Sequence, residues 1–181
     1  MGTLRKFRWL APSAIGLAFC SVLPAAGSAG QARAAQEPPQ VFGYLENAMI
    51  LPAGFLLKAK LDTGADHSSV HAKIIERSVK NGEPWITFDV ESVDGREIRL
   101  TEPVFRTAFV KRLVGQPHQR PVVMLTICVG KIKRRVEVNL MDRTKLKYNL
   151  LIGRSFMSGY MAVNPAKRFT KKPNCGVGES Q

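Results

Sequence analysis

Short runs of apolar and β-branched residues, each ended by turn-forming residues, dominate the chain from residue 41 to residue 165. Runs of roughly four to eight such residues, with Gly, Pro, Asn or Asp at their ends, are typical of β-strands. Helical periodicity is confined to two short candidates, residues 69–78 and 154–159. The predicted strands cover residues 41–44, 55–61, 86–93, 97–100, 105–111, 121–128, 131–141 and 149–152. The sequence therefore predicts an all-β fold class.

Two tight turns support this prediction. Asp94-Gly95 lies between two runs of alternating polarity, residues 86–90 and 96–100. An Asp-Gly pair in this setting is the strongest short-range signal for a β-hairpin, because both residues tolerate positive φ angles. Val129-Gly130-Lys131 joins two further β-branched runs in the same way. We expect both turns to connect antiparallel strands.

One turn carries a candidate for chemistry. The apolar run at residues 55–61 leads directly into Asp62-Thr63-Gly64-Ala65. This order places a carboxylate at the end of a buried strand. Gly64 allows a sharp turn, and the Thr63 hydroxyl can hydrogen-bond to the backbone. The three residues alone also fit a plain turn without any catalytic role.

The order of these segments resembles the retropepsin family over most of residues 55–160. Members of that family have a strand, Asp-Thr-Gly-Ala, a flap hairpin, two further strands, and a hydrophobic-hydrophobic-Gly segment before a short helix. Leu151-Ile152-Gly153-Arg154 matches the last segment. The resemblance implies a closed β-barrel with one short helix after this segment. It also implies that Asp62 is catalytic, together with Thr63 and Gly64.

Further site residues follow from the same resemblance. It assigns substrate binding to Ala65, Asp66, Ile152, Gly153 and Arg154, with an ion pair between Asp66 and Arg154.

The flap is less well defined. Residues 113–121, with Gly115 in the substrate-binding set, match a flap tip, and the runs 122–129 and 134–140 would follow as the paired strands. The stretch 72–109 is longer than in viral members, so the turn at residues 93–96 is a competing flap.

The mechanism of such proteases requires two carboxylates that share one proton. This chain has only one Asp-Thr-Gly, so the second carboxylate must come from another copy of the chain. The sequence therefore predicts a functional homodimer, with an extended peptide or protein substrate bound as an added strand.

No metal and no cofactor are expected. The chain is most similar to a bacterial group of retropepsin-like proteins labelled ATP-dependent zinc proteases, but it contains no Gly-x-x-x-x-Gly-Lys phosphate loop. His67 and His71 would share a face if a helix began there, with Asp66 or Glu76 as a third zinc ligand. However, the Glu of a His-Glu-x-x-His site is absent.

The ends of the chain suggest an exported protein. Residues 1–29 have a basic start, an apolar stretch and a small-residue tail, which is typical of a cleaved signal peptide. An uncleaved anchor and a lipoprotein acylated at Cys20 are the alternatives. Residues 30–40 would be a linker, 41–165 the retropepsin-like domain and 166–181 a flexible basic tail. We expect a periplasmic or secreted location.

The chain has 27 Lys and Arg against 14 Asp and Glu, a formal net charge of +13. Without residues 1–29 it would carry about +10. This charge fits a solvated surface, a preference for acidic substrates, or electrostatic association with the cell-envelope surface. Nucleic acid is not an expected partner, since aromatic residues do not alternate with the basic clusters.

Cysteine pairing stays open at this stage. Cys128 and Cys175 can pair in an oxidising compartment, but Cys128 also fits a small buried hydrophobe.

Three functions are compatible with these features. The first is an aspartic endopeptidase of the cell envelope, which hydrolyses peptide bonds with a water activated by paired Asp62 carboxylates. The second is a non-catalytic protein of the same fold that binds a peptide or an envelope partner. The third is a basic envelope-binding module in which the β-domain is only a scaffold.

Overall fold

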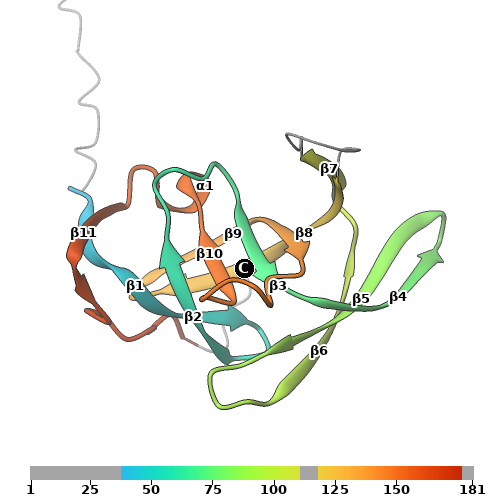
Figure 1. The fold of residues 1–181 in the computed structure, drawn as a ribbon, viewed down its shortest axis with the longest axis horizontal. Helices are drawn as coiled ribbons and strands as arrows, with labels where there is room; N and C mark the ends of the chain where they lie inside the picture. The colour runs from blue at the N-terminus through green and yellow to red at the C-terminus, as the bar shows by residue number, and fades with distance from the viewer. Residues whose placement is uncertain (1–37, 111–117, 177–181) are drawn as a thin grey trace, which may run out of the picture. The chain divides into compact units, whose positions relative to one another are not determined.

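A cyclic order of hydrogen-bonded strands defines the main body of the computed structural model, which describes residues 38–110 and 118–176. Within these residues, six strands follow one another in the order β1, β2, β10, β3, β9 and β8, and β8 pairs again with β1 (Figure 1). Their bounds are β1 Gln40–Leu51, β2 Phe55–Leu61, β3 Ser68–His71, β8 His118–Val129, β9 Ile132–Met141 and β10 Leu150–Ile152. The predicted closed barrel is confirmed.

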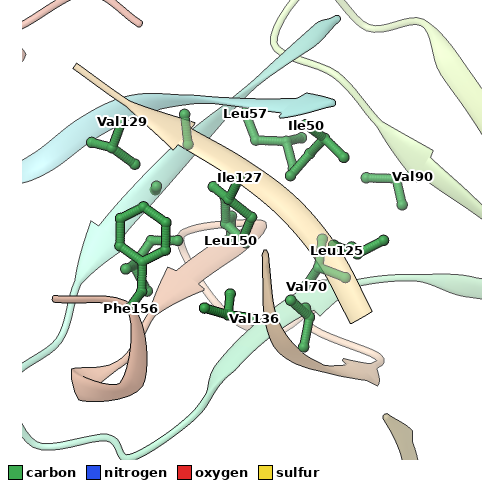
Figure 2. Close-up of a cluster of buried hydrophobic side chains, with 14 of the residues drawn as sticks. Ile50, Leu57, Val70, Val90, Leu125, Ile127, Val129, Val136, Leu150 and Phe156 are labelled. Atoms are coloured by element: carbon green, nitrogen blue, oxygen red, sulfur yellow. The ribbon is translucent and has the colours of Figure 1, made fainter. Parts of the chain in front are cut away.

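Alternating polarity explains why these segments form barrel strands. In β2, Phe55, Leu57, Ala59 and Leu61 are buried, whereas Lys58 between them is exposed. A strand places alternate side chains on opposite faces, so this pattern turns one face toward the core. The interior is filled by aliphatic and aromatic side chains from all six strands (Figure 2). Val90 and Phe156 come from outside these six strands and join the same core. Figure 2 labels both of them together with Ile50, Leu57, Val70, Leu125, Ile127, Val129, Val136 and Leu150.

Both predicted turns are present. β8 and β9 pair antiparallel, from Val122 opposite Asn139 to Val129 opposite Ile132. The turn between them contains Gly130, whose φ is +59°. The Asp94-Gly95 turn connects β5, Glu83–Glu91, to β6, Glu97–Pro103.

A separate three-stranded sheet is formed by β4, Lys73–Lys80, together with β5 and β6. Its long β4–β5 hairpin is drawn in light green in Figure 1. Arg99 on β6 donates two hydrogen bonds to Asp89 on β5, at 2.8 and 2.9 Å. This sheet occupies the stretch that is longer than in viral members of the family, and it adds to the barrel instead of replacing one of its strands.

The helix predicted at residues 69–78 was wrong, because this stretch forms β3 and most of β4. Val70 is buried in the barrel, where β3 runs parallel to β9. Ile74 and Ile75 lie on β4, whose pairing with β5 satisfies its backbone. Tertiary pairing, combined with the β preference of these branched residues, overrides a weak helical pattern.

The other predicted helix is confirmed as α1, Arg154–Met157, directly after the Leu-Ile-Gly segment. In the part of the chain that the structure describes, no helix is long and apolar enough to cross a membrane.

The structured region continues beyond residue 165, where we had expected the tail to begin. Strand β11, Met161–Arg168, pairs in parallel with β1 at one end of the strand order. At the other end, β7, Arg106–Val110, pairs with β8. The fully buried carboxylate of Glu46 accepts hydrogen bonds from the backbone N–H groups of Gly43, at 2.7 Å, and Thr170, at 3.0 Å. A disulfide then joins Cys175 to Cys128. These non-local contacts fix residues that, from composition, looked like a mobile tail.

The disulfide gives a first prediction. It links residues 47 positions apart, so its loss frees a long loop in the unfolded chain. We expect Cys175→Ser to lower the free energy of unfolding by about 2–4 kcal/mol. Denaturant unfolding of both proteins, with and without reductant, measures this difference. A reductant should destabilise the parent to the level of the variant and leave the variant unchanged; an equal effect of reductant on both would contradict the prediction.

A second prediction concerns acid stability. Hydrogen bonds from Arg99 hold the pKa of Asp89 below its usual value, although burial opposes this shift. A lowered folded-state pKa stabilises the protein above the unfolded value of about 3.9, and this contribution disappears as the pH falls through the folded value. We expect Asp89→Asn to lower the melting temperature at neutral pH and to flatten its fall below about pH 4. Glu91→Gln, which removes an exposed carboxylate from the same strand, should leave both quantities nearly unchanged.

Candidate functional site

Two parallel strand ends bring the candidate site together. β2 and β10 run side by side, with Leu61 opposite Ile152, so the residues after each strand emerge at the same edge of the barrel. The backbone N–H of Asp62 donates to the carbonyl oxygen of Ile152 at 2.9 Å. Segments about 90 residues apart in the sequence therefore meet at the carboxylate.

The Asp62 carboxylate is held on both oxygens. Its Oδ1 accepts a hydrogen bond from the backbone N–H of Gly64 at 3.0 Å, and its Oδ2 lies 3.4 Å from the ammonium of Lys60. The side chain of Asp62 is 27% exposed. The carboxylate is therefore oriented by its own loop but still reachable by water and by a ligand.

The loop after Asp62 is fastened to the start of α1. Arg154 donates its backbone N–H to the Ala65 carbonyl at 2.8 Å and its guanidinium to the Thr63 carbonyl at 2.8 Å. The guanidinium also pairs with the Asp66 carboxylate, so the ion pair implied by the family resemblance is present. Thr63 enters these contacts through its carbonyl oxygen, whereas the hydroxyl bond that we had expected is absent from the described contacts. The predicted residues 62–66 and 152–154 thus form one cluster.

Gly153 is packed too closely to carry any side chain. Its backbone N–H donates to the Ser68 hydroxyl at 3.2 Å. A Cβ at this position would lie 2.6 Å from the carbonyl carbon of His67 and 2.8 Å from the carbonyl oxygen of Asp66. This close approach of two backbones explains why the segment needs glycine.

A buried cation beside the site was missed by the sequence analysis. Arg143 is only 6% exposed, and its guanidinium donates to the Ser69 hydroxyl at 2.8 Å and to the Tyr148 carbonyl at 2.9 Å. Burial lowers the pKa of Arg143, the nearby charge of Arg120 lowers it further, and the charge of Asp62 opposes both effects. Arg143 therefore lies within electrostatic range of the candidate catalytic carboxylate. In the sequence it belongs to a basic run that resembled a solvated surface.

The competing flap at residues 93–96 does not cover Asp62. The backbone N–H of Val93 donates to the carbonyl of Leu56, near the start of β2, at 2.9 Å. Asp62 follows the other end of that strand, about 20 Å away at the usual rise per residue. The favoured flap tip, including Gly115, falls within residues 111–117, outside the described residues.

The two histidines that suggested zinc do not come together. His71 lies at the end of β3, so the extended backbone separates it from His67 by about 13 Å. His67 lies 3.6 Å from Glu137, whereas His71 accepts the backbone N–H of Arg143 at 2.8 Å. Across residues 38–110 and 118–176, no three His, Cys, Asp or Glu side chains are placed to hold a metal ion.

Comparison with known proteins gives a consistent family match. The profile of the RimB-like family, described as retropepsin-like aspartic endopeptidase RimB, matches residues 41–174. A protein of unknown function from Legionella pneumophila has a similar solved structure, with a TM-score of 0.62 and 36% sequence identity. That similarity covers 73% of this chain and 98% of the Legionella protein.

Curated relatives carry a different description. A probable alpha-L-glutamate ligase from Shewanella pealeana is 31% identical over 116 residues, which are 62% of this chain and 25% of the relative. Another, from Desulfotalea psychrophila, is 29% identical over 126 residues, covering 68% of this chain and 26% of the relative. The chain therefore spans about a quarter of the length of these relatives.

The packing at Gly153 gives a third prediction. Gly153→Ala forces apart the backbones of α1 and the loop at residues 66–67, and we expect it to lower the free energy of unfolding by about 1–3 kcal/mol. Gly64→Ala is a matched comparison, because its Cβ would meet only the Asp62 Oδ1, at 3.2 Å, which can rotate aside. Denaturant unfolding of both variants measures the difference. A larger loss of stability from the Gly64 substitution would contradict this account.

Proposed function

Because the chain belongs to the RimB-like family of retropepsin-like aspartic endopeptidases, we propose that it hydrolyses peptide bonds with a pair of Asp62 carboxylates. The observation that carries this proposal is the placement of Asp62. Its carboxylate is oriented by Gly64 at the end of β2 but remains partly exposed.

The reaction needs two such carboxylates. Held close together, they share one proton, because two adjacent negative charges repel each other. The ionised carboxylate accepts a proton from a bound water, and the water oxygen attacks the peptide carbonyl. The protonated carboxylate donates a hydrogen bond to the carbonyl oxygen, where negative charge develops. The carboxylate that took the proton from the water then donates it to the amide nitrogen, and the C–N bond breaks.

A twofold homodimer supplies the second carboxylate, since the sequence contains only one Asp-Thr-Gly. The exposure of Thr63 and Gly64 supports this arrangement, because residues beside Asp62 must be free to approach a second copy. Arg154 would stiffen the approaching loop through Thr63 and Asp66.

Acidic peptides are the substrates that the chemistry favours. Without residues 1–29 the chain carries a formal charge of about +10. Its curated relatives are named as probable glutamate ligases, and a region similar to this chain makes up about a quarter of each. The ligase name belongs to those longer relatives. A protease region carried beside a glutamate ligase would, however, meet glutamate-containing products, and a positive field attracts them.

We place this activity in the cell envelope or outside the cell. The signal-peptide pattern in residues 1–29 supports export, although these residues lie outside the described structure. The disulfide between Cys128 and Cys175 supports an oxidising compartment, where such bonds persist.

A non-catalytic peptide-binding role is the second candidate. The observation in its favour is the contact between Lys60 and Asp62, which gives the carboxylate a partner within its own subunit. A binding protein would tolerate the loss of Asp62, whereas a protease would not.

A fourth prediction separates the two candidates. We expect the parent protein to cleave members of a diverse peptide library at acidic pH, and we expect Asp62→Asn to lose at least about 1000-fold in rate while remaining folded and dimeric. Sedimentation of both proteins reports the dimer, and a chelator should leave cleavage unchanged. Cleavage that persists in Asp62→Asn, or a parent that cleaves as a strict monomer, would refute the proposal. A folded dimer that cleaves nothing would favour the peptide-binding role.

A further inference from the structure

A lysine lies beside the candidate catalytic carboxylate, on the strand that delivers it. The Lys60 ammonium lies 3.4 Å from Oδ2 of Asp62, whereas Oδ1 accepts the backbone N–H of Gly64 at 3.0 Å. Lys60 therefore contacts the carboxylate oxygen to which the loop donates no hydrogen bond among the described contacts. The proposed hydrolysis does not use this cation, because a shared proton and a bound water are sufficient for it.

The charged groups of the loop and of α1 are engaged with other partners. Arg154, at the start of α1, pairs with Asp66 on the loop. His67, at the end of the loop, lies 3.6 Å from Glu137 on β9. Strand β10, which aligns with the end of β2, carries no charged residue. None of these elements supplies a cation to the Asp62 carboxylate among the described ion pairs.

Arg143, which follows β9, acts on Asp62 only through its charge. Its guanidinium donates to the Ser69 hydroxyl at 2.8 Å and to the Tyr148 carbonyl at 2.9 Å. Its charge interacts with that of Asp62, but the two side chains form no ion pair among those described. In the described part of the chain, Lys60 is therefore the cation in direct contact with the carboxylate.

This contact gains importance when two copies of the chain meet. Above about pH 4, where an isolated aspartate is ionised, two adjacent carboxylates repel each other, and their approach favours the uptake of one proton. A dimer with such a pair on its axis and no nearby cation would weaken as the pH rises. A lysine at each carboxylate removes this requirement, because two lysines and two ionised aspartates carry no net charge.

The strength of the contact also depends on water. In the single chain the Lys60 side chain is 43% exposed, so its pairing with Asp62 contributes little there. A partner subunit that excludes water from the pair would strengthen it, since charges interact more strongly where the dielectric constant is low. The contact is therefore better suited to the dimer than to the single chain.

We propose that Lys60 is a positioning residue for assembly: it neutralises the charge of the paired Asp62 carboxylates, so that the twofold dimer forms at neutral pH without taking up a proton. Acidification then adds the single proton that hydrolysis requires to a site that is already assembled. This inference rests on the proposed function, because it assumes that two Asp62 carboxylates meet on the dimer axis.

The experiment measures the dissociation constant of the dimer by sedimentation between about pH 5 and pH 8. At about pH 7 we expect Lys60→Gln to weaken the dimer at least about tenfold, because two like charges are then brought together without a counterion. As the pH falls, its constant should approach that of the parent by up to about tenfold per pH unit, the slope that uptake of one proton per dimer gives. Lys60→Arg, which keeps the charge, should behave like the parent.

Two controls separate this role from a general charge effect. Lys58→Gln removes a cation from the same face of β2 and should leave the dissociation constant as in the parent. Lys60→Gln combined with Asp62→Asn removes the carboxylate as well, so its dimer should be no more dependent on pH than that of Asp62→Asn alone. Thermal unfolding of each variant confirms that it is folded.

The outcomes separate the role of Lys60 from the proposed protease activity. Equal pH dependence in the parent and in Lys60→Gln, an equal loss in Lys58→Gln, or an added pH dependence that persists without the carboxylate would overturn this role, even if the parent cleaves peptides. A parent that stays monomeric at every pH would overturn this role and the proposed dimer together. A Lys60-dependent dimer that cleaves nothing would support the role of Lys60 and contradict the protease.

Discussion

The parallel pairing of β2 with β10 is the contact on which the site depends. It aligns two strand ends from distant parts of the sequence, and the bond from Asp62 N–H to the Ile152 carbonyl closes the alignment. Beyond the strands, most of the contacts that involve Gly153 and Arg154 use main-chain groups of residues 63–66 or backbone packing. Because these contacts use the backbone, a side-chain substitution in residues 63–66 should change the direction of the Asp62 carboxylate little. The position of Asp62 is therefore a property of the barrel and not of the loop alone.

The sequence predicted the fold well where local signals are strong. β2 and the hairpins at Gly95 and Gly130 were found because alternation and turn residues mark them without reference to the rest of the chain. β4 was missed because most of its side chains are exposed, so it has no alternating burial to detect. β11 and the residues after it looked mobile by composition. Their order depends on β1, on the buried Glu46 and on Cys128, all far away in the sequence.

In the candidate site, too, some residues could be predicted from the sequence and others could not. Asp62, Gly153 and Arg154 could be predicted because the family resemblance preserves their order and spacing, and the ion pair with Asp66 followed from it. Lys60 and Arg143 could not be predicted as neighbours of the carboxylate. A lysine in an alternating strand and an arginine in a basic run look solvated, and only the closed barrel shows that Arg143 is buried. Proximity in three dimensions, not residue type, gives these cations a relation to the site.

The cations near Asp62 also depend on the strand order of the barrel. A buried charge is unfavourable unless other groups hold it, and the guanidinium of Arg143 donates to the Ser69 hydroxyl and to the Tyr148 carbonyl. Leu151 of β10 lies opposite Lys60 of β2 on one side and opposite Ser69 of β3 on the other. The strand that aligns Asp62 with Ile152 therefore also aligns the two strands that hold Lys60 and the partner of Arg143. A substitution that shifts β10 should displace the carboxylate and both cations together, whereas a substitution in the loop at residues 63–66 should leave the cations in place.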